Sequence, residues 1–166
     1  VVLAFADLLG VLAMRLQVPS KAAALATLVM LTGLAGATLI RATSWNSELA
    51  LALTSTRLAP DSGRAWNSLC VIRFEQGGGM TSGNPNLDQA IAACNRAADV
   101  SADSVKPLSN IIAFKSLRGD VTDADWSRLI ERLQHATMTP DNAAALWVIL
   151  NRVRDGAHLD AERILQ

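Results

Sequence analysis

The chain has 166 residues, enough for one ordinary domain, and its 15 basic and 15 acidic side chains leave no formal net charge. This balance removes the general electrostatic attraction toward nucleic acid, so we expect no nucleic-acid partner. Aromatic residues are scarce, with four Trp, three Phe and no Tyr, and the alanine- and leucine-rich remainder is typical of helical proteins.

Charge divides the chain into two parts. Residues 1–40 contain few charged side chains, namely Asp7, Arg15 and Lys21, whereas charges recur every few residues farther along. We therefore expect a membrane segment at 1–41 and a helical domain in water at 42–166. Because the sequence opens inside an apolar run without a methionine, we expect it to be a fragment of a longer protein.

The clearest membrane signal is the stretch from Ala22 to Ile40, which is uncharged and mostly apolar. As a helix it would be roughly 28 Å long, close to the thickness of a bilayer's hydrocarbon core. Its glycines and threonines are tolerated in membrane helices, where small residues allow close packing. The stretch predicts a transmembrane helix, and the alternative is a buried helix of a soluble protein.

The apolar run at 1–14 predicts the end of a second transmembrane helix, because no basic residues precede it as they would in a signal peptide. Asp7 in this run is a functional candidate by default, or it faces an interhelical contact. The connection that follows carries Arg15 and Lys21 and no acid, which favours the cytoplasmic side. Everything after Arg41 would then lie outside a bacterial inner membrane, in the periplasm.

Beyond Arg41 the apolar residues recur at helical spacing, and no strand is predicted. Helix-breaking residues gather at 59–63, 77–86, 119–123 and 139–141. The pattern predicts about six or seven short helices joined by turns. We expect the N-caps of the helices that follow these turns to be Asp61 or Ser62, Asp123 and Asp141.

The segment LAPDSGRAWNSLC at 58–70 resembles the junction between tetratricopeptide repeats. Pro60 matches the proline that closes one repeat, and Trp66 and Leu69 follow at the family's intervals. Cys70 stands where the family usually has glycine. The resemblance implies that helix pairs of the tetratricopeptide kind begin here.

The resemblance continues into the next helix and extends over about 45–102. Ala90, Cys94 and Ala97 match the small–large–small pattern that lets the two helices of a repeat pack closely, although Ala102 replaces the usual closing proline. The expected fold is therefore all-α. One or two N-terminal transmembrane helices would lead into a right-handed, tetratricopeptide-like array of antiparallel helix pairs.

The glycine-rich stretch EQGGGMTSGNPNLD at 75–88 falls between the two helices of this pair. Compared with the family's spacing, it inserts about eight residues. No lysine follows the glycines as in a P-loop, and the GxGxxG pattern is absent, so a phosphate site is not expected. We predict an enlarged, flexible surface turn within one helix hairpin.

Cys70 and Cys94 are the two cysteines of the sequence. If the repeat alignment holds, they lie on facing helices of one hairpin, within reach of a disulfide. An oxidising periplasm would permit that bond. The alternative is that two small, apolar side chains fill a tight contact.

No catalytic, cofactor-binding or metal-binding residue is assigned. His135 and His158 are isolated, and no catalytic triad or metalloprotease motif is present. The acids of DVTDAD at 120–125 fit a helix N-terminus better than a cation site. No cofactor is expected, and the sequence leaves open whether the parent protein is an enzyme.

The order of features looks like the C-terminal part of bacterial polytopic membrane proteins of surface-glycan assembly. These include O-mannosyltransferase-like enzymes and O-antigen polymerases or ligases. The residues that carry the resemblance are Arg41, Trp45, Pro60, Ser62, Arg64 and Ala65. It implies a parent that transfers or polymerises sugars from a polyprenyl-linked donor, with its catalytic residues upstream.

In that interpretation this piece is a membrane anchor plus an external module. Its partners would be membrane lipid and a protein or acceptor held on the repeat surface. The competing hypothesis is a non-enzymatic, membrane-anchored scaffold for protein–protein interaction in the cell envelope. A soluble helical regulator is a third possibility, and it requires Ala22–Ile40 to be buried in protein.

Overall fold

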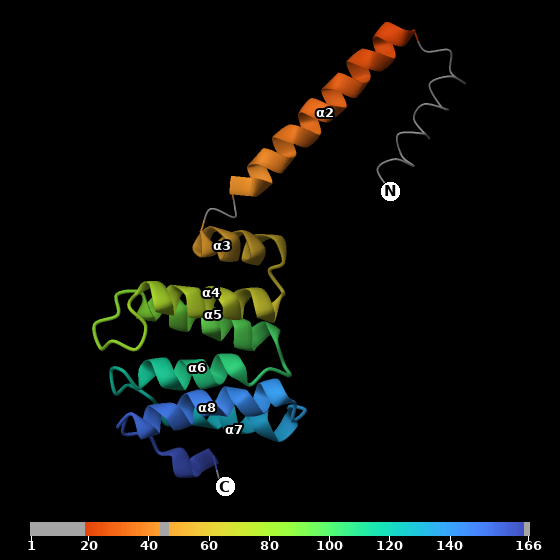
Figure 1. Ribbon diagram of the computed structural model, residues 1–166. Coiled ribbons are helices and arrows are strands. Elements are labelled where there is room, and N and C mark those ends of the chain that lie inside the picture. The colour runs from red at the N-terminus through yellow and green to blue at the C-terminus, as the bar shows by residue number, and fades with distance from the viewer. Residues whose placement is uncertain (1–18, 44–46, 165–166) are drawn as a thin grey trace. The chain divides into compact units, whose positions relative to one another are not determined.

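The computed structural model describes residues 19–43 and 47–164, and the regular structure in these ranges is entirely helical (Figure 1). The chain divides into two compact units, Val1–Asn46 and Ser47–Gln166. The all-α prediction is confirmed for the described part of the chain. Other expectations fall outside the described residues, namely the second transmembrane helix at 1–14, Asp7, Arg15 and Trp45.

The first unit contains α2 (Ser20–Thr43), a single long helix that includes the predicted Ala22–Ile40 stretch. Its 19-residue segment Ala24–Ala42 is apolar, and none of this segment is buried against other protein. By length and composition, α2 is the one helix in the described residues that could cross a membrane. Within the described residues, α2 is thus not enclosed by protein, as the alternative of a buried core helix would require.

Two threonine hydroxyls within α2 form hydrogen bonds inside the helix. The hydroxyl groups of Thr32 and Thr38 each donate a hydrogen bond of 2.8 Å to a carbonyl one turn earlier, those of Leu28 and Leu34. Such bonds remove the cost of leaving a hydroxyl without a partner in an apolar medium. The threonines are thus compatible with a lipid environment.

The second unit is built from six α-helices and one short 3-10 helix within its described residues. They are α3 (Glu48–Leu58), α4 (Gly63–Gln76), α5 (Leu87–Val100), α6 (Lys106–Lys115), α7 (Asp123–His135), α8 (Pro140–Arg154) and η1 (Ala161–Ile164). Consecutive helices pack against each other from α3 to α6, and α6 also contacts both α7 and α8 (Figure 1). The unit is therefore assembled mainly from contacts between neighbours in the sequence.

Helix α6 forms the centre of this unit. Every residue from Pro107 to Phe114 is buried, so α6 is covered on all sides by its neighbours. The rings of Phe74 from α4 and Phe114 stack with their centroids 3.7 Å apart. Burying a large apolar side chain contributes roughly 1.5–3 kcal/mol, so this run is a main source of stability.

The caps of the last two α-helices correct the sequence-based assignment. Asp123 and Asp141 were expected to be N-caps, but the capping hydroxyls belong to Thr122 and Thr139. These accept hydrogen bonds from backbone amides three residues later, at 3.3 and 3.2 Å. Each threonine has the extended backbone of a cap residue, and the aspartates fall in the first helical turn, where their charge is favourable.

Asp125 links α7 to α6. Its carboxylate accepts hydrogen bonds of 2.8 Å from Lys115 Nζ and of 2.8 and 2.7 Å from the amide and hydroxyl of Thr122. Burial raises the pKa of Asp125, but the hydrogen bonds from Lys115 and Thr122 outweigh it and hold the pKa below its usual value. This acid therefore serves a capping box rather than a cation site.

The turn after α5, residues 101–105, is held by side chains from distant helices. The guanidinium of Arg132 donates to the backbone carbonyls of Ala98, Ser101 and Ser104. The side chain of Asn142 accepts from Val105 N at 3.1 Å and donates to Asp103 O and Thr137 O at 2.9 Å. Arg132 thereby occupies carbonyls that the C-terminus of a helix leaves without partners.

We predict that Asp125→Asn lowers the free energy of unfolding by about 1–3 kcal/mol at neutral pH, because Lys115 loses its partly buried counter-ion. The folded-state pKa of Asp125 lies below the unfolded value of about 3.9, so its stabilisation is present above that value and is lost as pH falls through the folded pKa. Urea unfolding followed by tryptophan fluorescence at several pH values measures this.

The matched control is Glu131→Gln, which removes an exposed carboxylate from the same helix. It should change stability by less than about 0.5 kcal/mol. An Asp125→Asn deficit that is equally large at pH 3 and pH 7 would contradict this assignment of the ion pair.

Candidate functional site

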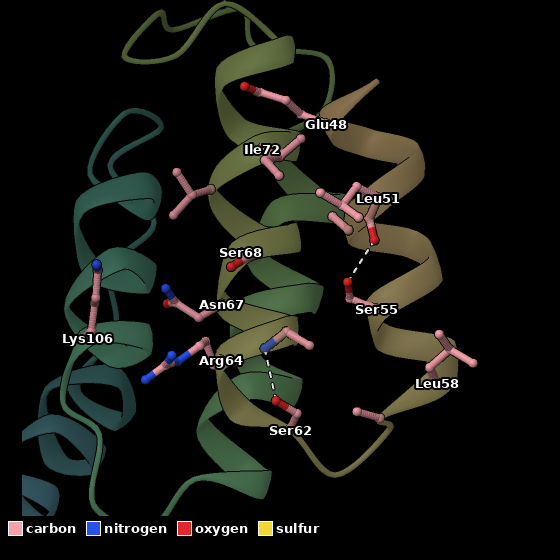
Figure 2. Close-up of a pocket in the computed structure, with 14 residues that line it drawn as sticks. Glu48, Leu51, Ser55, Leu58, Ser62, Arg64, Asn67, Ser68, Ile72 and Lys106 are labelled. Carbon is pink, nitrogen blue, oxygen red and sulfur yellow. Dashed lines mark hydrogen bonds between the residues drawn. The ribbon is translucent and has the colours of Figure 1, made fainter. Parts of the chain in front are cut away.

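A groove of about 790 Å³ runs between α3 and α4 (Figure 2). Its lining residues recur three to four positions apart on each helix, so each helix contributes one face. From α3 and its end come Glu48, Leu51, Ala52, Ser55, Leu58 and Ala59; from α4 and its cap come Ser62, Arg64, Ala65, Asn67, Ser68, Val71 and Ile72; α6 adds Lys106. Concave sites with mixed apolar and polar lining of this kind are typical of ligand binding.

The middle of the groove is apolar and accessible to solvent. Leu51, Val71 and Ile72 line it and are only partly buried. Two serine hydroxyls lie among them, and that of Ser55 donates to the carbonyl of Leu51 at 2.8 Å. The exposed hydroxyl of Ser68 projects from α4 on the same side (Figure 2). The surface thus combines apolar contact area with groups that can hydrogen-bond a ligand.

Charged side chains lie toward the two ends of the groove. Arg64 and Lys106 lie toward one end, and Glu48 lies beside Ile72 toward the other (Figure 2). None of these three charges forms an ion pair with any residue that the structure describes. Between the cations, Asn67 accepts a long hydrogen bond of 3.5 Å from Asn110 on α6.

The turn between α3 and α4 is fixed by residues that the sequence singled out. Ser62, rather than Asp61, caps α4 by accepting from Ala65 N at 3.3 Å. The indole Nε1 of Trp66 donates to the carbonyl of Pro60 at 2.7 Å. Trp66 therefore holds the turn at one end of the groove, and Leu69, one turn along, is buried in the core.

Helix α5 supports α4 on the side away from the groove. Ala90, Cys94 and Ala97 are completely buried, and the structure joins Cys70 of α4 to Cys94 in a disulfide with a Cα–Cα distance of 5.1 Å. None of the predicted repeat-packing residues lines the groove. They hold α4 from the side opposite the groove. The face of α4 that lines the groove is not predicted from the sequence.

Unlike the repeat-packing residues, some of the residues that carry the membrane-protein resemblance lie in the groove. Ser62, Arg64 and Ala65 all line the groove. Their spacing was noticed in the sequence, but a binding face could not be inferred from it because the position of α3 was unknown. On α3, Leu49 and Leu53 pack against the core, Leu51 lines the groove, and Ala52 belongs to the core and also borders the groove.

The glycine-rich insertion lies between α4 and α5, as predicted. Its conformation is held by hydrogen bonds of a buried side chain. Asn84 is buried, its amide donates to Phe74 O at 2.8 Å and Gly79 O at 3.0 Å, and its side-chain oxygen accepts from Asn86 N at 2.9 Å. A side chain at Gly77 would collide with this amide. Asn86 begins α5 but makes no capping bond through its side chain.

Other polar clusters offer weaker candidates. A smaller pocket of about 280 Å³ includes Arg128, Glu131, Arg132 and His135. Its arginines are already engaged, because Arg128 bonds Asn95 and Asp99 while Arg132 holds the turn after α5. Within the described ranges, no group of three or more His, Cys, Asp or Glu side chains could hold a metal ion.

Comparisons with known proteins do not supply a function. No protein-family model, no curated protein and no solved structure matches this chain. The features of the chain that bear on function are α2, the disulfide and the groove.

We predict that replacing both Cys70 and Cys94 by alanine lowers the free energy of unfolding by about 3 kcal/mol, because the disulfide no longer restricts the unfolded chain. Chemical denaturation followed by circular dichroism measures the loss. The unmutated chain in excess reductant is the matched control and should be destabilised by a similar amount. Equal stability of the oxidised and reduced forms would show that the cysteines act only by packing.

Proposed function

We propose that this chain is a membrane anchor joined to an extracytoplasmic, helical interaction module, with the groove between α3 and α4 as its binding surface. The observation that carries this proposal is α2, whose 19-residue apolar segment is not buried by any part of the chain that the structure describes. Leaving such a surface in water is costly, and a bilayer is the environment that its length matches.

The disulfide supports an extracytoplasmic position for the second unit. Cys70 and Cys94 are both completely buried and lie at the contact between α4 and α5. Disulfides persist in the bacterial periplasm and are rare in the cytoplasm, where thiols are kept reduced. The basic residues before α2, among them Lys21, favour the cytoplasmic side of the membrane. This orientation of α2 also places the second unit in the periplasm.

A tetratricopeptide-like arrangement is part of the proposal. The α4–α5 hairpin has fully buried small residues at the positions that the family uses, and α6 packs next to α5. In this interpretation α3 closes a preceding repeat, and α6 with α7 forms the following one. The packing of α8 on α6 departs from a regular array.

We further propose that the module belongs to a membrane protein of glycan transfer or polymerisation. The support is the resemblance around Arg41 and 60–65, together with the fact that Ser62, Arg64 and Ala65 line the groove. The module would then hold a protein partner or position an acceptor. The alternative is a non-enzymatic scaffold in the cell envelope, and the sequence encoded upstream of Val1 distinguishes the two, because a transferase needs many further spans and its own catalytic loops.

We predict that the chain stays in the membrane fraction after carbonate extraction, since α2 would be embedded in lipid. Alkaline phosphatase fused after Gln166 should be active, and a green fluorescent protein fused at the same place should be dark, because the C-terminus would be periplasmic. Substituting Leu28 and Leu31 by arginine is the matched control, and it should release the chain from the membrane. Extraction of the unmutated chain by carbonate, or a fluorescent fusion, would refute this arrangement.

We also predict that a photo-crosslinking amino acid at Ser68, inside the groove, captures a specific protein in intact cells. The same amino acid at Gln89, an exposed position on α5 outside the groove, serves as the control and should capture much less. Immunoblotting and mass spectrometry identify the products. Equal labelling at both positions would remove the groove as the binding surface.

A further inference from the structure

The groove is electrically polarised along α4. Arg64 and Lys106 lie toward one end, and Glu48 lies toward the other, next to Ile72 (Figure 2). The helical rise from Arg64 to Ile72 is about 12 Å. An extended polypeptide covers that distance with about four residues. The spacing of the charges therefore corresponds to a short extended segment.

These three charges have no ion-pair partner among the described residues, whereas several other ions of the domain are paired. Arg118, Arg128 and Arg163 pair with Asp88, Asp99 and Asp123, at N–O distances of 2.7, 3.4 and 2.8 Å. The groove charges form no such pair with any described residue, so they are free to meet charges on a ligand. Glu48 also lies in the first turn of α3, where it favours the helix, and a test must separate these two roles.

We propose, building on the proposed function, that the groove binds an extended segment of a protein partner with a basic residue at one end and an acidic residue at the other. The acidic residue would lie against Arg64 and Lys106, and the basic residue against Glu48. Between them, about three mostly apolar or small residues would contact Leu51 and the α4 face.

The lining favours a peptide over an anionic lipid. A lipid headgroup could bind the two cations, but its chain would then run past hydroxyl groups toward the carboxylate of Glu48. An acyl or prenyl chain gains nothing from those groups, and the groove leaves it open to water. A peptide can use the apolar contacts through its side chains, and Ser68 and Asn67 can hydrogen-bond its backbone.

The test uses the full chain in phosphatidylcholine nanodiscs and fluorescein-labelled peptides. Each peptide has one Lys and one Asp separated by one to eight alternating Leu and Ser residues. Fluorescence anisotropy should show the tightest binding when about three residues separate Lys from Asp. Arg64→Gln combined with Lys106→Gln should weaken that binding about 5- to 25-fold, because exposed charge contacts typically contribute up to about five-fold each. Added salt should weaken binding of the unmutated chain more than that of the variant.

Arg57→Gln is the matched control, since it removes an exposed cation of α3 that does not line the groove, and it should leave binding unchanged. Glu48→Lys should weaken binding of the Lys-bearing peptide and should strengthen binding of the same peptide with Glu in place of Lys. That exchange separates the contact with the ligand from the effect on α3, because a misfolded groove would bind neither peptide.

Binding that does not depend on the charge separation, or a Glu48→Lys variant that the exchanged peptide does not rescue, would overturn the inference. Preferential binding of phosphatidylglycerol vesicles through Arg64 and Lys106 would overturn it in favour of a lipid. If Ser68 still crosslinks a protein in cells but peptide binding does not depend on the charges, this inference fails and the proposed function stands. If the crosslink is absent, the proposed function fails as well.

Discussion

The close packing of α4 on α5 sets the geometry of the second unit. Two alanines and a disulfide allow the two helices to approach until the Cα atoms of Cys70 and Cys94 are 5.1 Å apart. A helix held this firmly on one face can expose its opposite face without losing its position. That opposite face of α4 is one wall of the groove, so the core and the candidate site depend on the same contact.

The remaining helices are organised around α6. It is buried through most of its length and receives α5 on one side and α7 and α8 on others. Long-range polar contacts then fix the connections, as when Arg132 and Asn142 hold the turn that leads into α6. The α3 helix has no such support, because its main helix contact in the unit is with α4. The groove therefore lies beside a helix that is held mainly by one neighbour.

Much of the fold could be predicted from the sequence because helices leave a periodic signal. The uncharged run that became α2, the insertion between α4 and α5, and the helical character of the rest were read from composition and spacing. Periodicity does not show which neighbour covers a helical face, so the groove was missed. The caps were displaced to Thr122 and Thr139 because capping depends on local backbone angles that residue type alone does not determine. The role of Arg132 could not be predicted from the sequence either, because its carbonyl partners lie about thirty residues away along the chain.

The buried amide of Asn84 has a consequence for how this domain can change. It ties together the two stems of the loop, while the tip at 80–83 is exposed and makes hydrogen bonds only to nearby backbone. Lengthening a surface loop costs little free energy once its ends are fixed. The tip is therefore a natural place for length variation during evolution, and for grafting an epitope or a spectroscopic tag without disturbing the helices on either side.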